Sequence, residues 1–318
     1  MLKKLLFSIV VLVLVAGAGV PAYFYGAYPK MRPAPAMTAA RTPEALERGR
    51  YLVTGLGCAN CHSPVDDTRP GDFPIASKLF AGRMFPEGMG LPGTVVAPNI
   101  SPDPESGLGQ WTDGEIARAI REGVSRDGRP LFPMMNYPNY SKLPDSDVMA
   151  IVAYLRTVPP QKGSPGITQL DFPVNMLIRT APKPLESSPA PLPPPGAERG
   201  KVLIDVGMCT DCHTQSEKGQ PKPGMYLAGG VPTKGPFGTV YSANITSHPA
   251  AGIGAYSDED LKRVFREGRN RSGRKLWVMP WSATQHLNDD DLNSLIAALR
   301  QIPPNPNLVA APELKKTE

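Results

Sequence analysis

Cysteine and histidine are scarce in this sequence, since its 318 residues include four of each. All four cysteines lie in two short stretches, Cys58–His62 and Cys209–His213, so no thiol remains for a disulfide or a separate nucleophile. A strong excess of one charge is also absent, because 34 Lys and Arg residues are interleaved with 29 Asp and Glu residues. A net charge of +5 spread in this way excludes the basic stripe typical of nucleic-acid binding.

The two cysteine-containing stretches share one pattern. They read Cys58-Ala59-Asn60-Cys61-His62 and Cys209-Thr210-Asp211-Cys212-His213. Each matches C-x-x-C-H, the attachment signature of c-type haem. Two thiols at this spacing can each add to a vinyl group of one haem, and the adjacent histidine then becomes the proximal iron ligand. We therefore predict two covalently bound haem c groups, attached through Cys58, Cys61, Cys209 and Cys212 and ligated by His62 and His213.

Two other uses of paired cysteines fit the sequence less well. A structural zinc site would bring two C-x-x-C pairs together, but here each pair lies in its own repeat and has its own histidine. A thioredoxin-like redox pair lies near alternating strands and helices, whereas the surrounding sequence predicts helices and proline-rich loops. Haem attachment is the favoured interpretation.

Residues 1–28 differ in character from the rest of the chain. Lys3 and Lys4 precede an uncharged run, from Leu5 to Tyr28, that is rich in Leu, Val and Ala. This layout is typical of exported proteins, and the run is near the ~20 residues that span a bilayer. We predict an inner-membrane anchor with the remainder facing the periplasm; the alternative is a cleaved signal and a soluble periplasmic protein. Residues 29–41 would form a stiff stalk.

An internal repeat organises the remaining chain. Three signatures recur in the same order at an offset of about 145 residues: Phe80-Ala81-Gly82 and Leu227-Ala228-Gly229, Asn99-Ile100-Ser101 and Asn244-Ile245-Thr246, and Arg121-Glu122-Gly123 and Arg266-Glu267-Gly268. We infer tandem copies of one domain, a first repeat at residues 42–160 and a second at residues 197–305. The proline-rich segment 161–196 is predicted to be an extended linker, and residues 306–318 a tail.

Helix boundaries follow from capping patterns. Thr42-Pro43-Glu44 predicts a helix start, with Thr42 as the N-cap. Capping boxes are expected at Thr112–Glu115 and at Ser257–Asp260, and Gly123 is expected to end the first of these helices in a left-handed conformation. The last helix of each repeat is expected at residues 144–157 and 288–300, where paired prolines follow.

Comparison of the repeats also indicates the second axial ligands. A low-spin electron-transfer haem needs a ligand on its distal face, and a Met thioether raises its potential. Met135 and Met279 lie at equivalent distances before Leu143 and Leu287, so we predict them as the distal ligands. Met134 is the alternative in the first repeat. His286, which is not repeated, would be the ligand only if the second haem were bis-histidine.

With both haem motifs, the Asn-Ile-Ser/Thr and Arg-Glu-Gly signatures and the late methionines, the chain resembles the di-haem class I cytochrome c family. It is similar in particular to the cytochrome c subunits of membrane-associated bacterial alcohol, aldehyde and gluconate dehydrogenases. The resemblance covers residues 42–305. It implies an all-α fold of two class I cytochrome c domains joined by the proline-rich linker, after the N-terminal anchor or signal segment.

The resemblance also implies specific residue roles and partners. The first and last helices of each domain should cross, with Gly49 meeting Tyr154 and Gly200 meeting Ala298. Asn99 and Asn244 should lie near the haem propionates. The donor would be a dehydrogenase, and the acceptor a membrane quinone, an oxidase or a cytochrome. Those dehydrogenase subunits typically carry three haems, whereas this chain has two motifs.

An enzyme is the alternative function. One haem would then be catalytic, as in di-haem peroxidases or thiosulfate-oxidising cytochromes. Such catalysis needs an open distal site or an unusual ligand such as cysteine, but this chain has no spare cysteine and offers a methionine in each repeat. We therefore predict electron transfer rather than catalysis.

Overall fold

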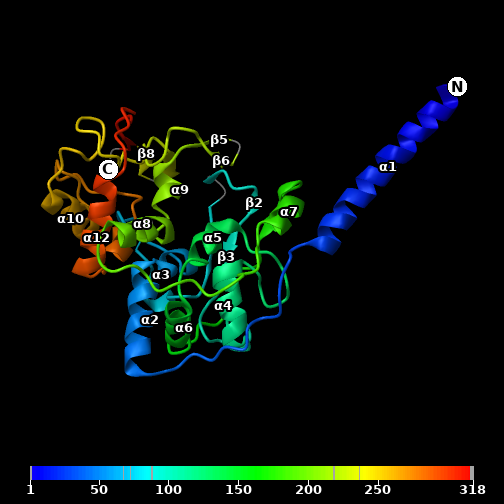
Figure 1. Ribbon diagram of the computed structural model, residues 1–318, viewed down its shortest axis with the longest axis horizontal. Coiled ribbons are helices and arrows are strands. Elements are labelled where there is room, and N and C mark those ends of the chain that lie inside the picture. Colours follow the sequence, from blue (N-terminus) through cyan, green and yellow to red (C-terminus); the bar gives the residue numbers. More distant parts are fainter. Residues whose placement is uncertain are drawn as a thin grey trace.

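The computed structural model describes residues 2–66, 68–71, 73–86, 89–217, 219–235 and 237–315. The fold is mainly helical, as expected, but it is not all-α: short antiparallel strands, including a three-stranded sheet, accompany the helices. Figure 1 shows a body made of both repeats, from which the N-terminal helix extends.

Helix α1 (Leu2–Ala27) is 26 residues long and contains Pro21. Within the part of the chain that is described, no helix has both the length and the apolar character needed to cross a membrane. The end of α1 contacts α7 (Val174–Leu177) and the 3-10 helix η4 (Ile178–Thr180). There the Arg179 side chain donates hydrogen bonds to the carbonyls of Phe24, Tyr25 and Tyr28.

The first repeat contains the helices that the capping patterns predicted, with further short helices and strands between them. Its elements are α2 (Pro43–Gly55), α3 (Cys58–His62), η1 (Ala76–Lys78), β1 (Arg83–Met84), β2 (Gly93–Thr94), β3 (Val96–Ala97), α4 (Asp113–Glu122), η3 (Pro133–Met135), α5 (Tyr137–Tyr140) and α6 (Asp145–Leu155). The Thr42 cap and the Thr112 capping box are both present, and Gly123 ends α4 at φ 71°. Local sequence therefore determined where these helices begin and end.

The second repeat follows the same order. Its elements are α8 (Ala197–Val206), α9 (Cys209–His213), β5 (Ser216–Glu217), β6 (Gln220–Pro221), β7 (Pro232–Gly235), β8 (Gly238–Tyr241), α10 (Asp258–Glu267), α11 (Trp281–Thr284) and α12 (Asp289–Arg300). The predicted capping box joins Ser257 and Asp260, and Asn288 caps α12.

In each repeat the first and last helices cross at a glycine. A Cβ at Gly49 would lie 2.0 Å from the Ala150 carbonyl oxygen and 2.8 Å from the Tyr154 Cβ. A Cβ at Gly200 would lie 2.7 Å from the Ala298 Cβ. Both expected pairs are thus in contact, and only glycine permits the backbones to approach so closely.

Two clusters of buried apolar side chains lie under these crossings. One includes Val53, Ile116, Val148 and Val152 of the first repeat. The other includes Ile204, Leu261, Leu292 and Leu295 of the second repeat. Val206 of α8 is buried in the first cluster, so the two repeats share apolar contacts.

The predicted linker and the predicted tail each contribute a strand that pairs with a strand of a repeat. Strand β4 (Gln169–Leu170) pairs with β2, and β9 (Glu313–Leu314) pairs with β8. These pairs are equivalent, because Gly93 faces Leu170 as Gly238 faces Leu314. The repeated structure therefore continues past residues 160 and 305. Lys316, Thr317 and Glu318 of the predicted tail lie outside the described residues.

Candidate haem sites

Both C-x-x-C-H motifs form one turn of helix directly after a left-handed residue. Gly57 precedes α3 at φ 69°, and Met208 precedes α9 at φ 59°. The left-handed residue redirects the chain, so that each motif starts a new helix rather than extending α2 or α8. The cysteine side chains are partly buried, except that of Cys212, which is exposed.

The two motif histidines have equivalent hydrogen-bond partners. His62 Nδ1 lies 2.8 Å from the carbonyl oxygen of Pro98, and His213 Nδ1 lies 2.6 Å from that of Ala243. A carbonyl only accepts, so Nδ1 carries the proton in each ring and the Nε2 lone pair is left for a metal. Burial lowers the pKa of both imidazoles, which favours the neutral form that ligates iron.

The Phe-Ala-Gly and Leu-Ala-Gly signatures hold the chain beside the motifs. The Gly82 N–H donates to the His62 carbonyl at 2.7 Å, and the Gly229 N–H donates to the His213 carbonyl at 2.7 Å. Phe80 and Leu227 adopt φ values of 65° and 54°, which are rare for non-glycine residues. Because a non-glycine residue adopts this strained conformation at the same position in both repeats, we infer that the site requires it.

The predicted distal methionines lie in equivalent packing environments. Met135 packs against the first apolar cluster together with Cys58, and Met279 packs against the second together with Cys209. Met134 instead packs against a small third cluster together with Cys61. By this comparison Met135, rather than Met134, is the counterpart of Met279.

The Arg-Glu-Gly signatures anchor the loops that carry these methionines. The Gly123 carbonyl accepts a hydrogen bond from Leu131 N, and the Gly268 carbonyl accepts one from Leu276 N, both at 2.8 Å. An aromatic ring covers each glycine: a Cβ at Gly123 would lie 2.5 Å from the Tyr137 ring. The sequence showed that this signature recurs, but not that its glycine holds the start of the methionine-bearing loop.

The amides of Asn99 and Asn244 are already occupied by protein groups. Asn99 Nδ2 donates to the carbonyls of Gln161 at 2.6 Å and Gly163 at 3.0 Å. Asn244 Nδ2 donates to those of Asn305 at 2.8 Å and Asn307 at 3.1 Å. Both residues are buried and hold the segments after residues 160 and 305. The geometry gives them a structural role, and their predicted proximity to haem propionates stays a prediction.

The other two histidines lie in surface turns. His248 Nδ1 accepts hydrogen bonds from the backbone N–H groups of Ala250 and Ala251, which fix a local turn. His286 is exposed.

The residues of each motif suit a haem by their chemistry. Each motif offers two thiols and a neutral imidazole, the groups that attach and ligate haem c, and a methionine packs against the same apolar cluster as its first cysteine. Burial raises the pKa of Cys58 and of Cys209 to about 12, so both thiols are neutral when they are not attached. Among the described residues, no group of three or more His, Cys, Asp or Glu side chains is arranged to hold a metal ion.

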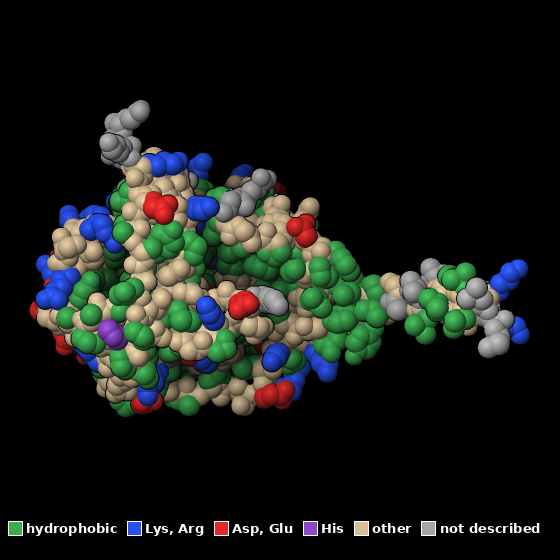
Figure 2. Space-filling view, turned by 90° about the horizontal axis from the view of Figure 1, so that it is seen from above, with side chains coloured by type: hydrophobic (Ala, Val, Ile, Leu, Met, Phe, Trp, Pro, Cys, Tyr) green, Lys and Arg blue, Asp and Glu red, His purple; other side chains and the backbone are tan. Residues whose placement is uncertain are grey.

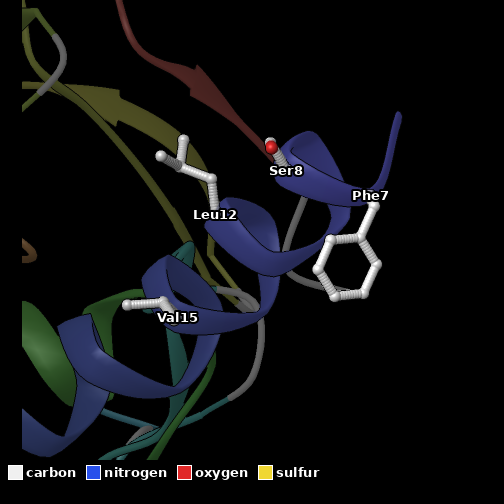
Figure 3. Close-up of a pocket in the computed structure, with 4 residues that line it drawn as sticks. All are labelled: Phe7, Ser8, Leu12 and Val15. Atoms are coloured by element: carbon white, nitrogen blue, oxygen red, sulfur yellow. The ribbon is translucent and has the colours of Figure 1, made fainter. Parts of the chain in front are cut away.

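A shallow apolar hollow of about 290 Å³ lies elsewhere, on the surface of α1. Figure 3 shows its lining residues, Phe7, Ser8, Leu12 and Val15, which all come from this one helix. It contains no residue of either haem motif and is not part of the candidate sites.

Comparison with known proteins agrees with this geometry. The family model for cytochrome c matches residues 46–159. A di-haem cytochrome c-type protein of Cereibacter sphaeroides is 30% identical, over 85% of this chain and 89% of that protein.

Longer relatives are subunits of dehydrogenases. The cytochrome c subunit of a quinone-dependent alcohol dehydrogenase from Gluconacetobacter polyoxogenes is 28% identical over 84% of this chain. The fructose dehydrogenase cytochrome subunit of Gluconobacter japonicus is 30% identical over 85% of it. The alignments span only 58% and 54% of those two relatives. From the motifs, the geometry and these matches together, the chain belongs to the cytochrome c family.

Proposed function

We propose that this chain is a di-haem c-type cytochrome that passes single electrons from a dehydrogenase to the respiratory chain. The observation that carries the proposal is the duplicated site, in which a C-x-x-C-H helix and a carbonyl-bonded histidine occur twice at equivalent positions. Haem c, when bound, supplies an iron that takes up and releases one electron.

The residues of each repeat would hold such a group from both sides. Cys58 and Cys61 would form the thioether bonds of the first haem, and Cys209 and Cys212 those of the second. His62 presents Nε2 because the Pro98 carbonyl holds the proton on Nδ1. Met135 and Met279 would complete the coordination. A six-coordinate site favours outer-sphere electron transfer over catalysis at the metal.

Similarity to dehydrogenase subunits supports a dehydrogenase as the electron donor. The proposed acceptor is a membrane quinone, an oxidase or another cytochrome. We place the protein at the periplasmic face of the inner membrane, with residues 1–28 as the anchor. The apolar exposed surface of α1, which includes Leu5, Leu6 and Phe7, supports this location. Figure 2 shows further hydrophobic side chains gathered where this helix joins the body.

Visible and EPR spectra of the purified full-length protein test the proposal. We expect two low-spin haems per chain, with a methionine-to-iron band near the red end of the spectrum. A high-spin ferric haem, or turnover of peroxide by the isolated protein, would contradict electron transfer and favour the haem-enzyme alternative.

Replacement of the methionines tests the ligand assignment. Met279→Ala should lower the midpoint potential of one haem, and Met135→Ala that of the other, because a thioether ligand raises haem potential. Spectroelectrochemical titration measures both potentials. Met134→Ala is the matched control and should leave them nearly unchanged; if it acts as Met135→Ala was expected to, Met134 is the first ligand.

A further inference from the structure

The chain segments that follow the two predicted methionine ligands each lie against the other repeat. Helix α5 follows Met135 and contacts α8, the helix that leads into the second haem motif. Helix α11 follows Met279 and contacts α2, the helix that leads into the first haem motif. The contact is reciprocal, as in an interface between two copies related by a two-fold axis.

Asn136 makes a buried polar contact from the first repeat to the second. Its side-chain Nδ2 lies 3.2 Å from the carbonyl oxygen of Asp205 and 3.3 Å from that of Val206. These carbonyls are at the end of α8, where backbone oxygens lack the usual i+4 donor, although the Asp205 oxygen also accepts from Met208 N at 3.1 Å. Val206 is three positions before Cys209. Asn136 thus donates to the end of α8, the helix that precedes the second haem motif.

Asn136 lies where its hydrogen bonds to α8 can affect the backbone of Met135. The residue directly follows Met135, is 3% exposed, and adopts φ 57°, a left-handed conformation that asparagine tolerates better than most residues. A shift of its side chain therefore moves the backbone that carries Met135. Nearby, Lys142 and Asp205 form an ion pair across the same boundary.

The return contact comes from the second repeat. Asn60, inside the first haem motif, donates through Nδ2 to Ser282 Oγ at 2.8 Å, and both residues are buried. Trp281 packs edge to face against Phe73 with ring centroids 4.8 Å apart. Each methionine-bearing loop is thus bonded at one end within its own repeat and at the other to the opposite repeat, at Asn60 of the first haem motif in one case and at the end of α8 in the other.

We propose that Asn136 is a positioning residue that ties the Met135 loop to the end of α8, just before the second haem motif, so that the two haem sites respond to each other. The inference rests on the proposed function, because it takes Met135 as an iron ligand. Removal of the amide leaves two carbonyls of α8 without this donor and lets the loop move. Any coupling between the sites acts equally in both directions, since binding free energies are reciprocal.

Asn136→Gly in the haem-loaded, full-length protein tests the proposal. Glycine keeps the left-handed backbone and removes the side chain, which ends both the bonds to α8 and the bond that Asn136 Oδ1 accepts from Asn139 Nδ2. We expect the methionine-to-iron band to lose the contribution of one haem, and the midpoint potential of that haem to fall in a redox titration. Unchanged band and potentials in a variant with wild-type circular dichroism would overturn the proposal.

Two further variants sharpen the test. Ser141→Ala is the matched control: its hydroxyl donates only to Pro138 within the same loop, so both potentials should stay as in the wild type. Ser282→Ala removes the hydroxyl that accepts from Asn60 and should affect the potential of the other haem. It replaces Asn136→Gly as the test if that variant does not fold. If the unmodified protein already lacks methionine ligation, the proposed function fails. If the unmodified protein has it and the variants change neither the methionine-to-iron band nor the potentials, this inference alone fails.

Discussion

At the residue scale, the glycines that end α4 and α10 explain why a three-residue signature recurs. Gly268 adopts φ 61°, and a Cβ there would lie 2.2 Å from the Trp281 ring. Its counterpart Gly123 combines φ 71° with the Tyr137 ring in the same place. Only glycine satisfies both the backbone conformation and the close aromatic contact, so the methionine loops of both repeats depend on it.

Gly268→Ala should lower the free energy of unfolding by about 3 kcal/mol, because left-handed strain and overpacking against Trp281 add together. Denaturant titration followed by circular dichroism measures the change. Gly273→Ala is the control: its φ is 84° but no atom lies within 4 Å of its Cβ position, so we expect only about 1 kcal/mol. Equal losses in the two variants would show that the Trp281 contact contributes nothing.

At the scale of elements, short strands and side-chain amides complete each repeat from outside the predicted domain boundaries. Strands β4 and β9 pair with β2 and β8, and the amides of Asn99 and Asn244 hold the chain just before each of them. The segment after each last helix is thus bound to the loop that carries the histidine-bonding carbonyl, since Pro98 and Ala243 directly precede these asparagines.

Asn244→Ala should release the chain after residue 304. The buried amide donates to two carbonyls and accepts from Thr246, so its loss should cost about 2 kcal/mol of stability. Hydrogen exchange of residues 305–315 should become faster. Asn270→Ala, which removes the hydrogen bonds of an exposed turn, is the control. Unchanged exchange after Asn244→Ala would contradict the role given to this amide.

At the scale of the whole molecule, the two repeats are joined by polar contacts as well as apolar ones. The Tyr51 hydroxyl of α2 donates to the carboxylate of Asp291 in α12 and accepts from Asn288 N at 3.3 Å. Asp291 is 2% exposed and also forms an ion pair with Arg199. Burial raises the pKa of Tyr51, so its hydroxyl remains a donor at neutral pH.

Tyr51→Phe should lower the free energy of unfolding by about 2 kcal/mol, because a buried carboxylate loses one of its donors. Thermal and denaturant unfolding measure the loss. Tyr241→Phe is the control, since its hydroxyl bonds to the exposed carboxylate of Glu313 within one repeat. We expect that change to stay within about 0.5 kcal/mol. A loss as small for Tyr51→Phe would mean that this contact does not stabilise the joined repeats.

The sequence by itself determined the features that depend on neighbouring residues. The C-x-x-C-H motifs, the capping boxes at Thr112 and Ser257 and the glycine helix end at Gly123 are local patterns, and the structure has helices and caps at those places. Comparison of the two repeats paired Met135 with Met279, and the resemblance to class I cytochromes c paired Gly49 with Tyr154, a contact that the structure contains.

Only the tertiary structure decided which distant groups meet. The partner of His62 lies 36 residues away, that of Asn99 lies 62 away, and that of Asn136 lies 70 away. No local pattern encodes such a pair, because a backbone carbonyl can accept from any donor that packing brings to it. The histidine-bonding carbonyls and the attachment of the linker and tail depend on this long-range packing. So does the reciprocal contact between each methionine-bearing loop and the other repeat.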